Sequence, residues 1–273
     1  MNTKAIYMPK GKAGEYAKWA CNFYIGCSND CEYCYCKKGV LGHALGKPIA
    51  KLKKCFDGHS PYGVFIRELH EHIVQLREHG LFFSFTTDPL LPETQDLTNA
   101  AVLYAVNQGV PCKILTKRAD FKVFDSFEPF KHLIAYGFTL TGMDSMEMNA
   151  STNMERISTM HYLHDRGFKT FASIEPIINL EESMQMIEQS LEYCDLYKIG
   201  LLTGHKEYSP EEVEKFMVLV SDTIREYRTN HPQRPPYVYF KDSMYQYIKR
   251  NRNDFLTGTT YIVNNDFNLF KQQ

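Results

Sequence analysis

The chain alternates between short apolar runs and longer amphipathic segments, and this alternation predicts its architecture. The apolar runs have the length of buried strands, whereas the amphipathic segments repeat apolar residues every three or four positions, as helices do. Strands are expected at residues 19–25, 81–86, 110–117, 134–141, 169–176 and 196–202. Helices are expected at residues 61–79, 94–107, 127–133, 151–165, 180–193 and 210–229. Strands that alternate with helices of this length form βαβ units around a parallel sheet.

The number of these units suggests a domain organisation. Six βα units in residues 19–230 predict an α/β fold, an open, partial (β/α)6 barrel of the TIM type. Residues 1–18 precede it as an N-terminal arm. The proline-rich break His231–Pro236 begins a C-terminal extension, residues 231–273, that we expect to close the open side of the barrel. A chain of 273 residues suits one large domain of this kind.

Composition narrows the class of protein. Hydrophobic residues make up 44% of the chain and charged residues 23%, as in ordinary globular proteins. No apolar run is long enough to cross a bilayer, and Met1–Lys4 lacks the apolar core of a signal peptide. We therefore expect a cytoplasmic protein with no membrane partner. The eight cysteines are then expected to be reduced, and their clustering favours a metal site over disulfides.

The charge of the chain is unevenly distributed. The net charge is −1, but residues 1–55 hold ten lysines against three acidic residues, a balance of +7, so the remainder sums to −8. This positive segment could steer a polyanion such as a nucleic acid toward the nearby cysteines. It could equally be a solvated face that keeps the protein soluble.

The cysteines closest together follow the first predicted strand. Cys27, Cys31 and Cys34 have a Cys-x3-Cys-x2-Cys spacing, which lets three thiolates of one loop surround one face of a [4Fe-4S] cluster. The fourth iron is then left open for a second molecule. A structural zinc is the alternative, but such a site needs four ligands, usually completed by a second Cys or His pair, and the sequence has no such pair.

Polar residues stand where the other predicted strands end. In parallel α/β folds, binding groups collect at this edge of the sheet, although the same residues also cap βα junctions. Lys117 would offer its ammonium to a carboxylate, and Glu175 would accept from hydroxyl or ammonium groups unless it pairs with Lys169 or Lys198. The residues at these ends are Thr86, Thr87, Asp88, Thr116, Lys117, Thr139, Thr141, Ser173, Glu175, Thr203 and His205.

The cysteine spacing is the signature of the radical S-adenosylmethionine enzymes, which this sequence resembles. Within them it is most similar to the spore photoproduct lyase group, in Tyr33 and Tyr35 flanking Cys34, in Thr86-Thr87-Asp88, and in Leu115-Thr116-Lys117. The resemblance implies the partial barrel, a [4Fe-4S] cluster whose open iron binds S-adenosylmethionine, and a reductant of the flavodoxin or ferredoxin type. It also implies reductive cleavage of S-adenosylmethionine to a 5′-deoxyadenosyl radical that abstracts hydrogen from a substrate.

The resemblance also implies roles for single residues. Tyr33 and Tyr35 would pass a hydrogen atom, and Lys117 would hold the cofactor; alternatively, Tyr33 packs against the adenine and Tyr35 inside the barrel. Phe85 stands where the lyase has its hydrogen-donating cysteine, so Cys36 is either a substitute donor or a buried thiol. The substrate stays open between a nucleic acid, a small molecule and a peptide. A non-catalytic metal-binding module that recognises nucleic acid is the remaining alternative.

Overall fold

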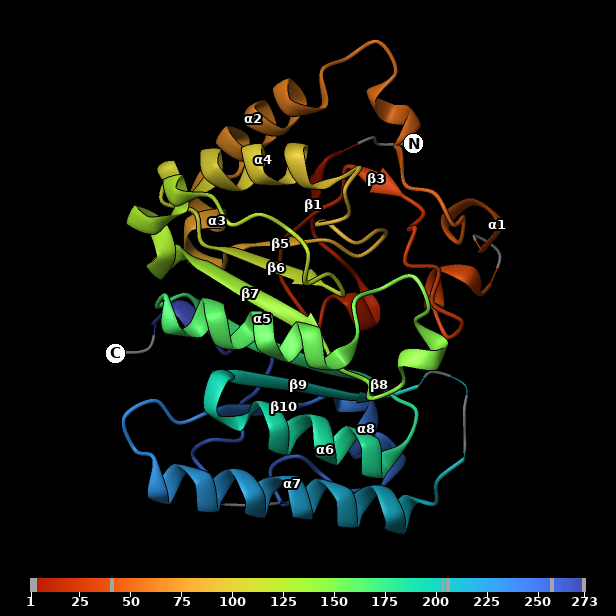
Figure 1. Ribbon diagram of the computed structural model, residues 1–273, viewed down its shortest axis with the longest axis vertical. Coiled ribbons are helices and arrows are strands. Elements are labelled where there is room, and N and C mark those ends of the chain that lie inside the picture. Colours follow the sequence, from red (N-terminus) through yellow and green to blue (C-terminus); the bar gives the residue numbers. More distant parts are fainter. Residues whose placement is uncertain (1–3, 40–41, 203, 205–206, 256–257, 272–273) are drawn as a thin grey trace. The chain divides into compact units, whose positions relative to one another are not determined.

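The computed structural model describes residues 4–39, 42–202, 204, 207–255 and 258–271 (Figure 1). The chain forms two compact units. The first consists of Met1–Gly137 with Ser145–Thr152, and the second of Phe138–Asp144 with Asn153–Gln273. Strand β7 contributes residues to both of them.

The first unit contains a mostly parallel sheet with the strand order β1-β2-β5-β6-β7. Strands β2 and β5 run parallel, as do β5 and β6, whereas β1 runs antiparallel to β2. A separate antiparallel pair joins β3 to β4. The bounds are β1 Ile6–Tyr7, β2 Ala20–Cys21, β3 Tyr24–Ile25, β4 Lys51–Leu52, β5 Leu81–Phe83, β6 Cys112–Thr116 and β7 Ile134–Thr139.

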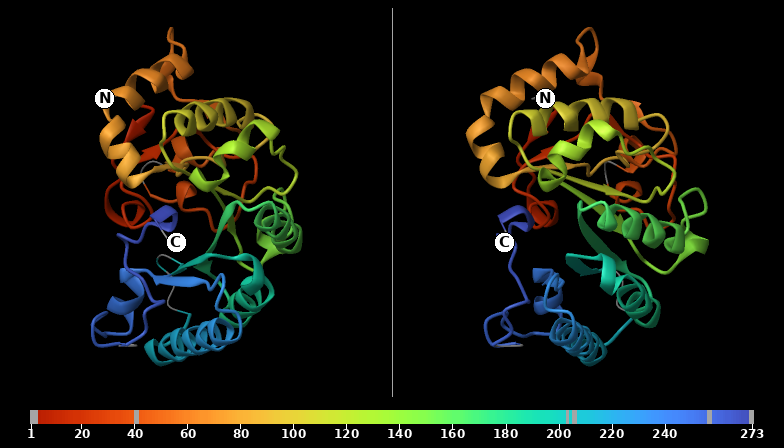
Figure 2. Two further views of the ribbon diagram at one scale, coloured as in Figure 1. Left: turned by 90° about the vertical axis from the view of Figure 1, so that its left-hand side faces the viewer. Right: turned by 60° about the vertical axis from the view of Figure 1, so that its left-hand side comes forward.

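The helices of the first unit begin and end at residues suited to these positions. Ser60 caps α2 by accepting a hydrogen bond from the Gly63 amide, and Pro61 occupies the first turn. Helices α2 and α4 lie side by side in Figures 1 and 2. The α-helices are α1 Gly42–Leu45, α2 Pro61–Glu71, α3 Ile73–His79 and α4 Gln95–Asn107; the 3-10 helices are Gly11–Ala13, Tyr35–Lys37, Lys54–Phe56 and Asp125–Leu133.

The second unit continues the same alternation in the order β7-β8-β9-β10. Strands β8 and β9 are parallel, and so are β9 and β10. Helices α6 and α7 lie side by side along β9 and β10 in Figure 1. The elements are α5 Asn153–Asp165, β8 Lys169–Ile177, α6 Leu180–Ser190 with the 3-10 turn Leu191–Tyr193, β9 Leu196–Leu201, α7 Pro210–Asn230, β10 Tyr237–Phe240, α8 Asp242–Tyr247 and the 3-10 turn Leu269–Lys271; a further 3-10 turn is Asp144–Met146.

The mixed α/β fold with mostly parallel strands confirms the predicted class, while closure into a partial barrel stays a prediction. The first predicted strand is in fact two strands in different sheets. Asn22 separates them, because its buried side chain donates to the Tyr7 hydroxyl (2.8 Å) and accepts from the Phe85 amide (2.8 Å). The second predicted strand ends at Phe83, since the chain then turns and Thr86 donates its hydroxyl to the Tyr24 carbonyl (2.6 Å).

Two predicted helices also differ from the structure. The helix expected over 61–79 divides at His72 into α2 and α3, and residues Asp125–Leu133 form a 3-10 helix containing Pro129. The strong start predicted at Ser209 is confirmed by a capping box in which Ser209 and Glu212 bond reciprocally.

Residues 237–240, predicted to belong to the C-terminal extension, add strand β10 to the second unit. Arg234 fastens the approach to this strand, because its Nε and Nη2 bind the two carboxylate oxygens of Asp195 at 2.6 and 2.8 Å. Asp195 also accepts from the Thr170 amide at 2.7 Å. A buried carboxylate with a bidentate guanidinium and a backbone donor is well satisfied, so this cluster holds the start of β10 beside β8 and β9.

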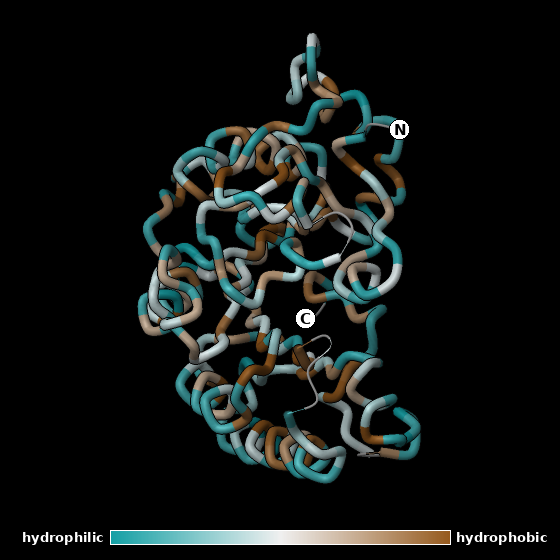
Figure 3. Tube along the Cα trace, turned by 90° about the vertical axis from the view of Figure 1, so that its right-hand side faces the viewer, coloured by the Kyte–Doolittle hydropathy of each residue, from teal (hydrophilic) through white to brown (hydrophobic). Residues whose placement is uncertain are grey.

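Within the described ranges, no helix is both long and apolar enough to span a membrane. The tube in Figure 3 shows why: its hydrophobic stretches are short and interleaved with hydrophilic ones along the whole trace.

Candidate metal and cofactor site

The cysteine loop follows β3 directly and begins at a residue that must be glycine. Gly26 has φ +80°, and a Cβ at this position would lie 2.3 Å from the Ile49 carbonyl oxygen. The close approach lets the Cys27 amide donate to the Lys47 carbonyl at 2.9 Å. The loop is thereby pinned to the segment that leads into β4.

The loop cysteines differ in exposure and in acidity. Cys31 is buried, while Cys27 and Cys34 are half-buried, and none of the three forms a disulfide. Burial raises the pKa of Cys27 to about 12. A hydrogen bond from the Cys36 thiol lowers the pKa of Cys34 below its usual range, which favours the thiolate form. Among the described residues, no three His, Cys, Asp or Glu side chains are gathered into a metal-binding group, so the ligand set stays a prediction.

Asp88 ties the cysteine loop to the ends of β5 and β6. Its side chain is buried, and Asn29 of the loop donates to Oδ2 at 2.8 Å. The Lys117 amide donates to the same oxygen at 2.7 Å, while Thr116 (2.7 Å) and the Leu90 amide (3.0 Å) donate to Oδ1. The predicted polar residues Asp88, Thr116 and Lys117 are therefore brought together with the loop, and both carboxylate oxygens of Asp88 are fully used.

Two buried polar atoms next to this cluster lack a hydrogen-bond partner within the described part of the chain. They are Oδ1 of Asn29 and Oγ1 of Thr87. Buried polar atoms are nearly always paired, and an unpaired one in a native structure needs an explanation. A bound polar molecule would supply the missing partners. The residues therefore fit the cofactor expected at Thr87, and the three cysteines outside any disulfide have the donor chemistry of an iron–sulfur ligand set.

Lys117, Tyr33 and Glu147 form a second cluster beside the loop. The Tyr33 hydroxyl donates to Oε1 of Glu147. The Lys117 ammonium lies 3.8 Å from the same oxygen and 5.4 Å from the centre of the Tyr33 ring. The Glu32 amide donates to the Met146 carbonyl at 3.0 Å, which fastens the segment carrying Glu147 to the cysteine loop. Lys117, which directly follows β6, thus lies near a carboxylate, and this carboxylate belongs to a residue of the chain itself.

Tyr35 and Cys36 both contact Phe85, which lies within the second predicted strand and just beyond the observed end of β5. The Tyr35 hydroxyl donates to the Phe85 carbonyl, and Cys36 Sγ lies 3.7 Å from the same oxygen. The Cys36 side chain is buried, whereas most of the Tyr35 ring is exposed. Cys36 therefore occupies the neighbourhood of Phe85, the position that is a cysteine in the spore photoproduct lyase group.

Thr139 and Glu175 lie in the second unit. Thr139 is buried, and its carbonyl accepts from Arg156 Nη1 at 2.7 Å. Glu175, for which a pair with Lys169 or Lys198 was the alternative to a cofactor contact, binds Lys241 of the C-terminal extension through Oε1 at 2.7 Å. Gly200 makes room for this pair, because a Cβ there would lie 2.8 Å from the Lys241 side chain. Lys169 instead lies 3.9 Å from Asp195. Thr203 and His205 lie outside the described residues.

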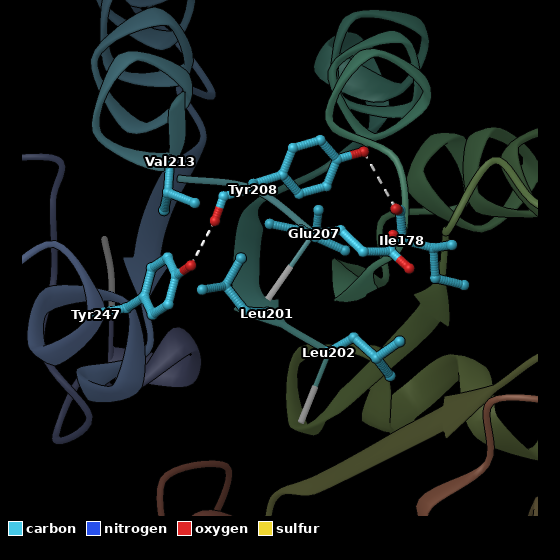
Figure 4. Close-up of a pocket in the computed structure, with 8 residues that line it drawn as sticks. Ile178, Leu201, Leu202, Glu207, Tyr208, Val213 and Tyr247 are labelled. Atoms are coloured by element: carbon cyan, nitrogen blue, oxygen red, sulfur yellow. Dashed lines mark hydrogen bonds between the residues drawn. The ribbon is translucent and has the colours of Figure 1, made fainter. Parts of the chain in front are cut away.

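A small hollow opens at the carboxyl ends of β8 and β9 in the second unit (Figure 4). Both of its tyrosine hydroxyls are already engaged, since Tyr247 donates to the Tyr208 carbonyl and Tyr208 donates to the Ile178 carbonyl at 3.3 Å. The remaining lining is mostly aliphatic, so the hollow suits an apolar group. It is lined by Ile177, Ile178, Leu201, Leu202, Glu207, Tyr208, Val213 and Tyr247.

Two residues of these clusters, Glu147 and Asn29, were not predicted from the sequence. Asn29 lies between Cys27 and Cys31, so its place inside the motif was an available signal. Glu147 offered none, because it follows no predicted strand, and 114 positions separate it from the tyrosine that donates to it. Only the folded chain brings the two together.

No family model matches the chain. An uncharacterized protein of Methanocaldococcus jannaschii is 26% identical over 195 residues, covering 68% of this chain and 71% of that protein. Among solved structures, Streptococcus suis SuiB bound to its precursor peptide SuiA has a TM-score of 0.51 at 11% identity. This match covers 80% of the chain and 48% of SuiB. The chain shares this fold.

SuiB bound to S-adenosylmethionine gives a TM-score of 0.49 at 13% identity and covers 67% of this chain and 42% of SuiB. The present chain spans less than half the length of SuiB in each of these matches. The likeness therefore concerns the fold of the shared portion.

Proposed function

We propose that this protein is a radical S-adenosylmethionine enzyme of the spore photoproduct lyase-like group, built on a partial barrel. The observation that carries the proposal is the loop with three cysteines outside any disulfide, Cys27, Cys31 and Cys34, directly after a strand in a chain with the fold of SuiB. These cysteines would hold a [4Fe-4S] cluster, which supplies the electron for reductive cleavage of S-adenosylmethionine.

The cofactor would be bound by residues that the structure gathers around the loop. The unpaired hydroxyl of Thr87 and the ammonium of Lys117 are polar groups suited to the methionine part, while the ring of Tyr33 suits the adenine. Asp88 would act by holding the loop against β6, since its oxygens are already used. Thr139 and Glu175, which belong to the second unit, stay predictions from the sequence.

Reconstitution tests this proposal. The protein is incubated anaerobically with iron and sulfide, then reduced in the presence of S-adenosylmethionine. We expect bound iron and sulfide, a broad absorption in the blue part of the visible spectrum, and release of 5′-deoxyadenosine. A folded protein that takes up one zinc, retains no iron and releases no 5′-deoxyadenosine would instead be a non-catalytic metal-binding module.

The position of Cys36 supports a lyase-like hydrogen return. Its thiol lies 3.7 Å from the carbonyl oxygen of Phe85, the residue that replaces the lyase cysteine. A thiol exchanges its hydrogen with solvent, so in heavy water Cys36 would carry deuterium. We expect 5′-deoxyadenosine released without substrate in heavy water to contain deuterium, and Cys36→Ala to lower the deuterated fraction several-fold. Mass spectrometry of the released nucleoside measures it.

The control for this prediction is Cys55→Ala, which removes a half-buried thiol outside the loop. Its deuterated fraction should equal that of the unaltered protein. An unchanged fraction in Cys36→Ala, with the iron content also unchanged, would show that Cys36 is only a buried thiol. Tyr33 and Tyr35 would then be the remaining proposed hydrogen carriers.

The segment from Lys47 to Lys54, which contains β4, supports a negatively charged partner. Lys47, Lys51 and Lys54 are exposed, and none of them pairs with an acidic residue among those the structure describes. The Lys47 carbonyl binds the cysteine loop, so these charges lie close to it. A nucleic-acid substrate and an acidic reductant of the flavodoxin or ferredoxin type both suit such a surface, because positive charge speeds association with either.

Binding measurements at several salt concentrations test the nucleic-acid alternative. If the substrate is a nucleic acid, Lys51→Glu with Lys54→Glu should weaken binding of a labelled single-stranded RNA or DNA at least tenfold. The affinity of the unaltered protein should fall steeply as salt rises from 50 to 200 mM. Fluorescence anisotropy measures both effects. The control pair, Lys10→Glu with Lys122→Glu, makes the same charge change elsewhere in the first unit and should leave binding nearly unchanged. Absence of any binding at 50 mM salt would favour a small molecule or peptide as substrate.

A further inference from the structure

Glu147 is a buried acid for which neither the sequence motif nor the proposed reaction provides a role. Only 2% of the residue is exposed, and its side chain is fully covered. A buried carboxylate is costly unless it is paired and hydrogen-bonded. Here Tyr33 supplies the hydrogen bond and Lys117 the opposite charge. Tyr33 and Lys117 are both proposed to contact the cofactor, so the Glu147 carboxylate lies directly next to the proposed binding site.

The geometry leaves Lys117 available to a ligand. A charge-assisted hydrogen bond between an ammonium and a carboxylate is about 2.8 Å long. The distance of 3.8 Å between Lys117 Nζ and Glu147 Oε1 is well beyond that. Glu147 therefore attracts the ammonium without binding it tightly. The Tyr33 ring, 5.4 Å away, supports it from a second side. The side chain of Lys117 keeps 18% exposure, through which its N–H groups can reach a ligand.

The charges of Lys117 and Glu147 together suit a ligand with a net positive charge better than a neutral one. Lys117 alone would make the site positive and would favour anions, whereas Lys117 with Glu147 is neutral overall. S-adenosylmethionine carries a carboxylate, an ammonium and a sulfonium, so its net charge is +1. Its thioether analogue S-adenosylhomocysteine has the same carboxylate and ammonium but no net charge. A covered negative charge behind the lysine lowers the energy of the sulfonium form without touching it.

We propose that Glu147 is a positioning and specificity-determining residue. It fixes Lys117 and Tyr33 beside the cysteine loop and, through its charge, makes the site prefer the sulfonium cofactor to its neutral thioether analogue. This inference rests on the proposed function, because it assumes that the loop binds S-adenosylmethionine.

The test compares two ligands rather than activities. Dissociation constants of S-adenosylmethionine and S-adenosylhomocysteine are measured by isothermal titration calorimetry on the anaerobically reconstituted protein. Glu147→Gln keeps the size of the side chain and an acceptor for Tyr33 but removes the charge. We expect the ratio of the two constants to shift about tenfold toward the thioether, the size of one charge interaction across about 10 Å at an effective dielectric constant near 20.

Two further variants control for structure. Glu147→Asp retains the charge and should retain most of the preference, even if it weakens both ligands equally. Glu71→Gln removes an exposed acid on α2 that lies 4.0 Å from Arg67, and it should change neither constant. If Glu147→Gln does not fold, loss of preference by Glu147→Asp would overturn the inference, and its retention would support it.

The outcomes also separate the inference from the function on which it rests. If the unaltered protein binds neither ligand, the proposed function fails and this inference fails with it. If the unaltered protein binds S-adenosylmethionine and Glu147→Gln keeps the same preference over the thioether, the function stands and Glu147 has no such role.

Discussion

Cys31→Ala should abolish retention of the iron–sulfur cluster while leaving the protein folded. The predicted ligand set has three thiolates, and with two the cluster loses a second corner to solvent. Cys31 belongs to a loop whose neighbours are fixed by other contacts, such as that of the Cys27 amide with the Lys47 carbonyl. Iron and sulfide analysis after reconstitution and desalting should therefore show a loss of at least tenfold, with little change in the circular dichroism spectrum.

Cys55→Ala is the matched control for this prediction. Cys55 is also a free cysteine of the first unit, but it lies in the 3-10 helix Lys54–Phe56 outside the loop. Its variant should retain the same iron as the unaltered protein. Equal iron contents in Cys31→Ala and Cys55→Ala would show that the metal is held elsewhere and would remove the basis of the proposed function.

Asp88→Asn should cause the second large effect, a loss of about 3 kcal/mol in the free energy of unfolding. The carboxylate accepts four hydrogen bonds, two on each oxygen. An amide at this position can accept on one oxygen only, and its NH2 group would face two donors. Denaturant titration measures the change. The new amide can place its NH2 group toward Asn29, and the hydrogen bond that connects Asn29 to the end of β6 is then lost. The amount of iron retained should therefore fall as well.

Asp120→Asn provides the comparison for Asp88→Asn. Asp120 is an exposed carboxylate of the same unit, and its partner is Arg118. The Arg118 guanidinium lowers the pKa of Asp120. The small stabilisation from that ion pair is therefore present at neutral pH and disappears as pH falls through the lowered pKa. Its replacement should cost less than about 1 kcal/mol at neutral pH. A similar small loss for both variants would mean that the Asp88 network is not a principal support of the loop.

The strand and helix alternation was predictable because each element carries its own pattern. The apolar runs that became β5 through β9 contain residues buried in the sheet, and helices such as α7 begin at a clear Ser-Pro-Glu-Glu signal. The errors occurred where one polar side chain overrides the pattern. Asn22 divides the first strand because its amide bonds sideways to the Tyr7 hydroxyl and the Phe85 amide, contacts that local periodicity does not encode.

The site was predictable in part for the same reason. The three cysteines lie within eight positions and Tyr33 and Tyr35 flank the last of them, so their proximity follows from the covalent chain. Asp88 and Lys117 were expected at strand ends, and the structure does gather them at the loop. What could not be predicted was the partner of each charge. Glu175 pairs with Lys241, which is 66 positions away and was not among the lysines considered from the sequence.

The sequence by itself determined the order of strands and helices and the cysteine loop, because those features depend on residues close together along the chain. Only the tertiary structure decided which groups bind the Asp88 carboxylate, namely Asn29, Thr116 and two backbone amides. It also decided that Cys36 lies beside Phe85 and that Glu147 contacts Lys117 and Tyr33. The physical reason is that a buried charge or donor must find a partner wherever packing places one, and that choice is made in space.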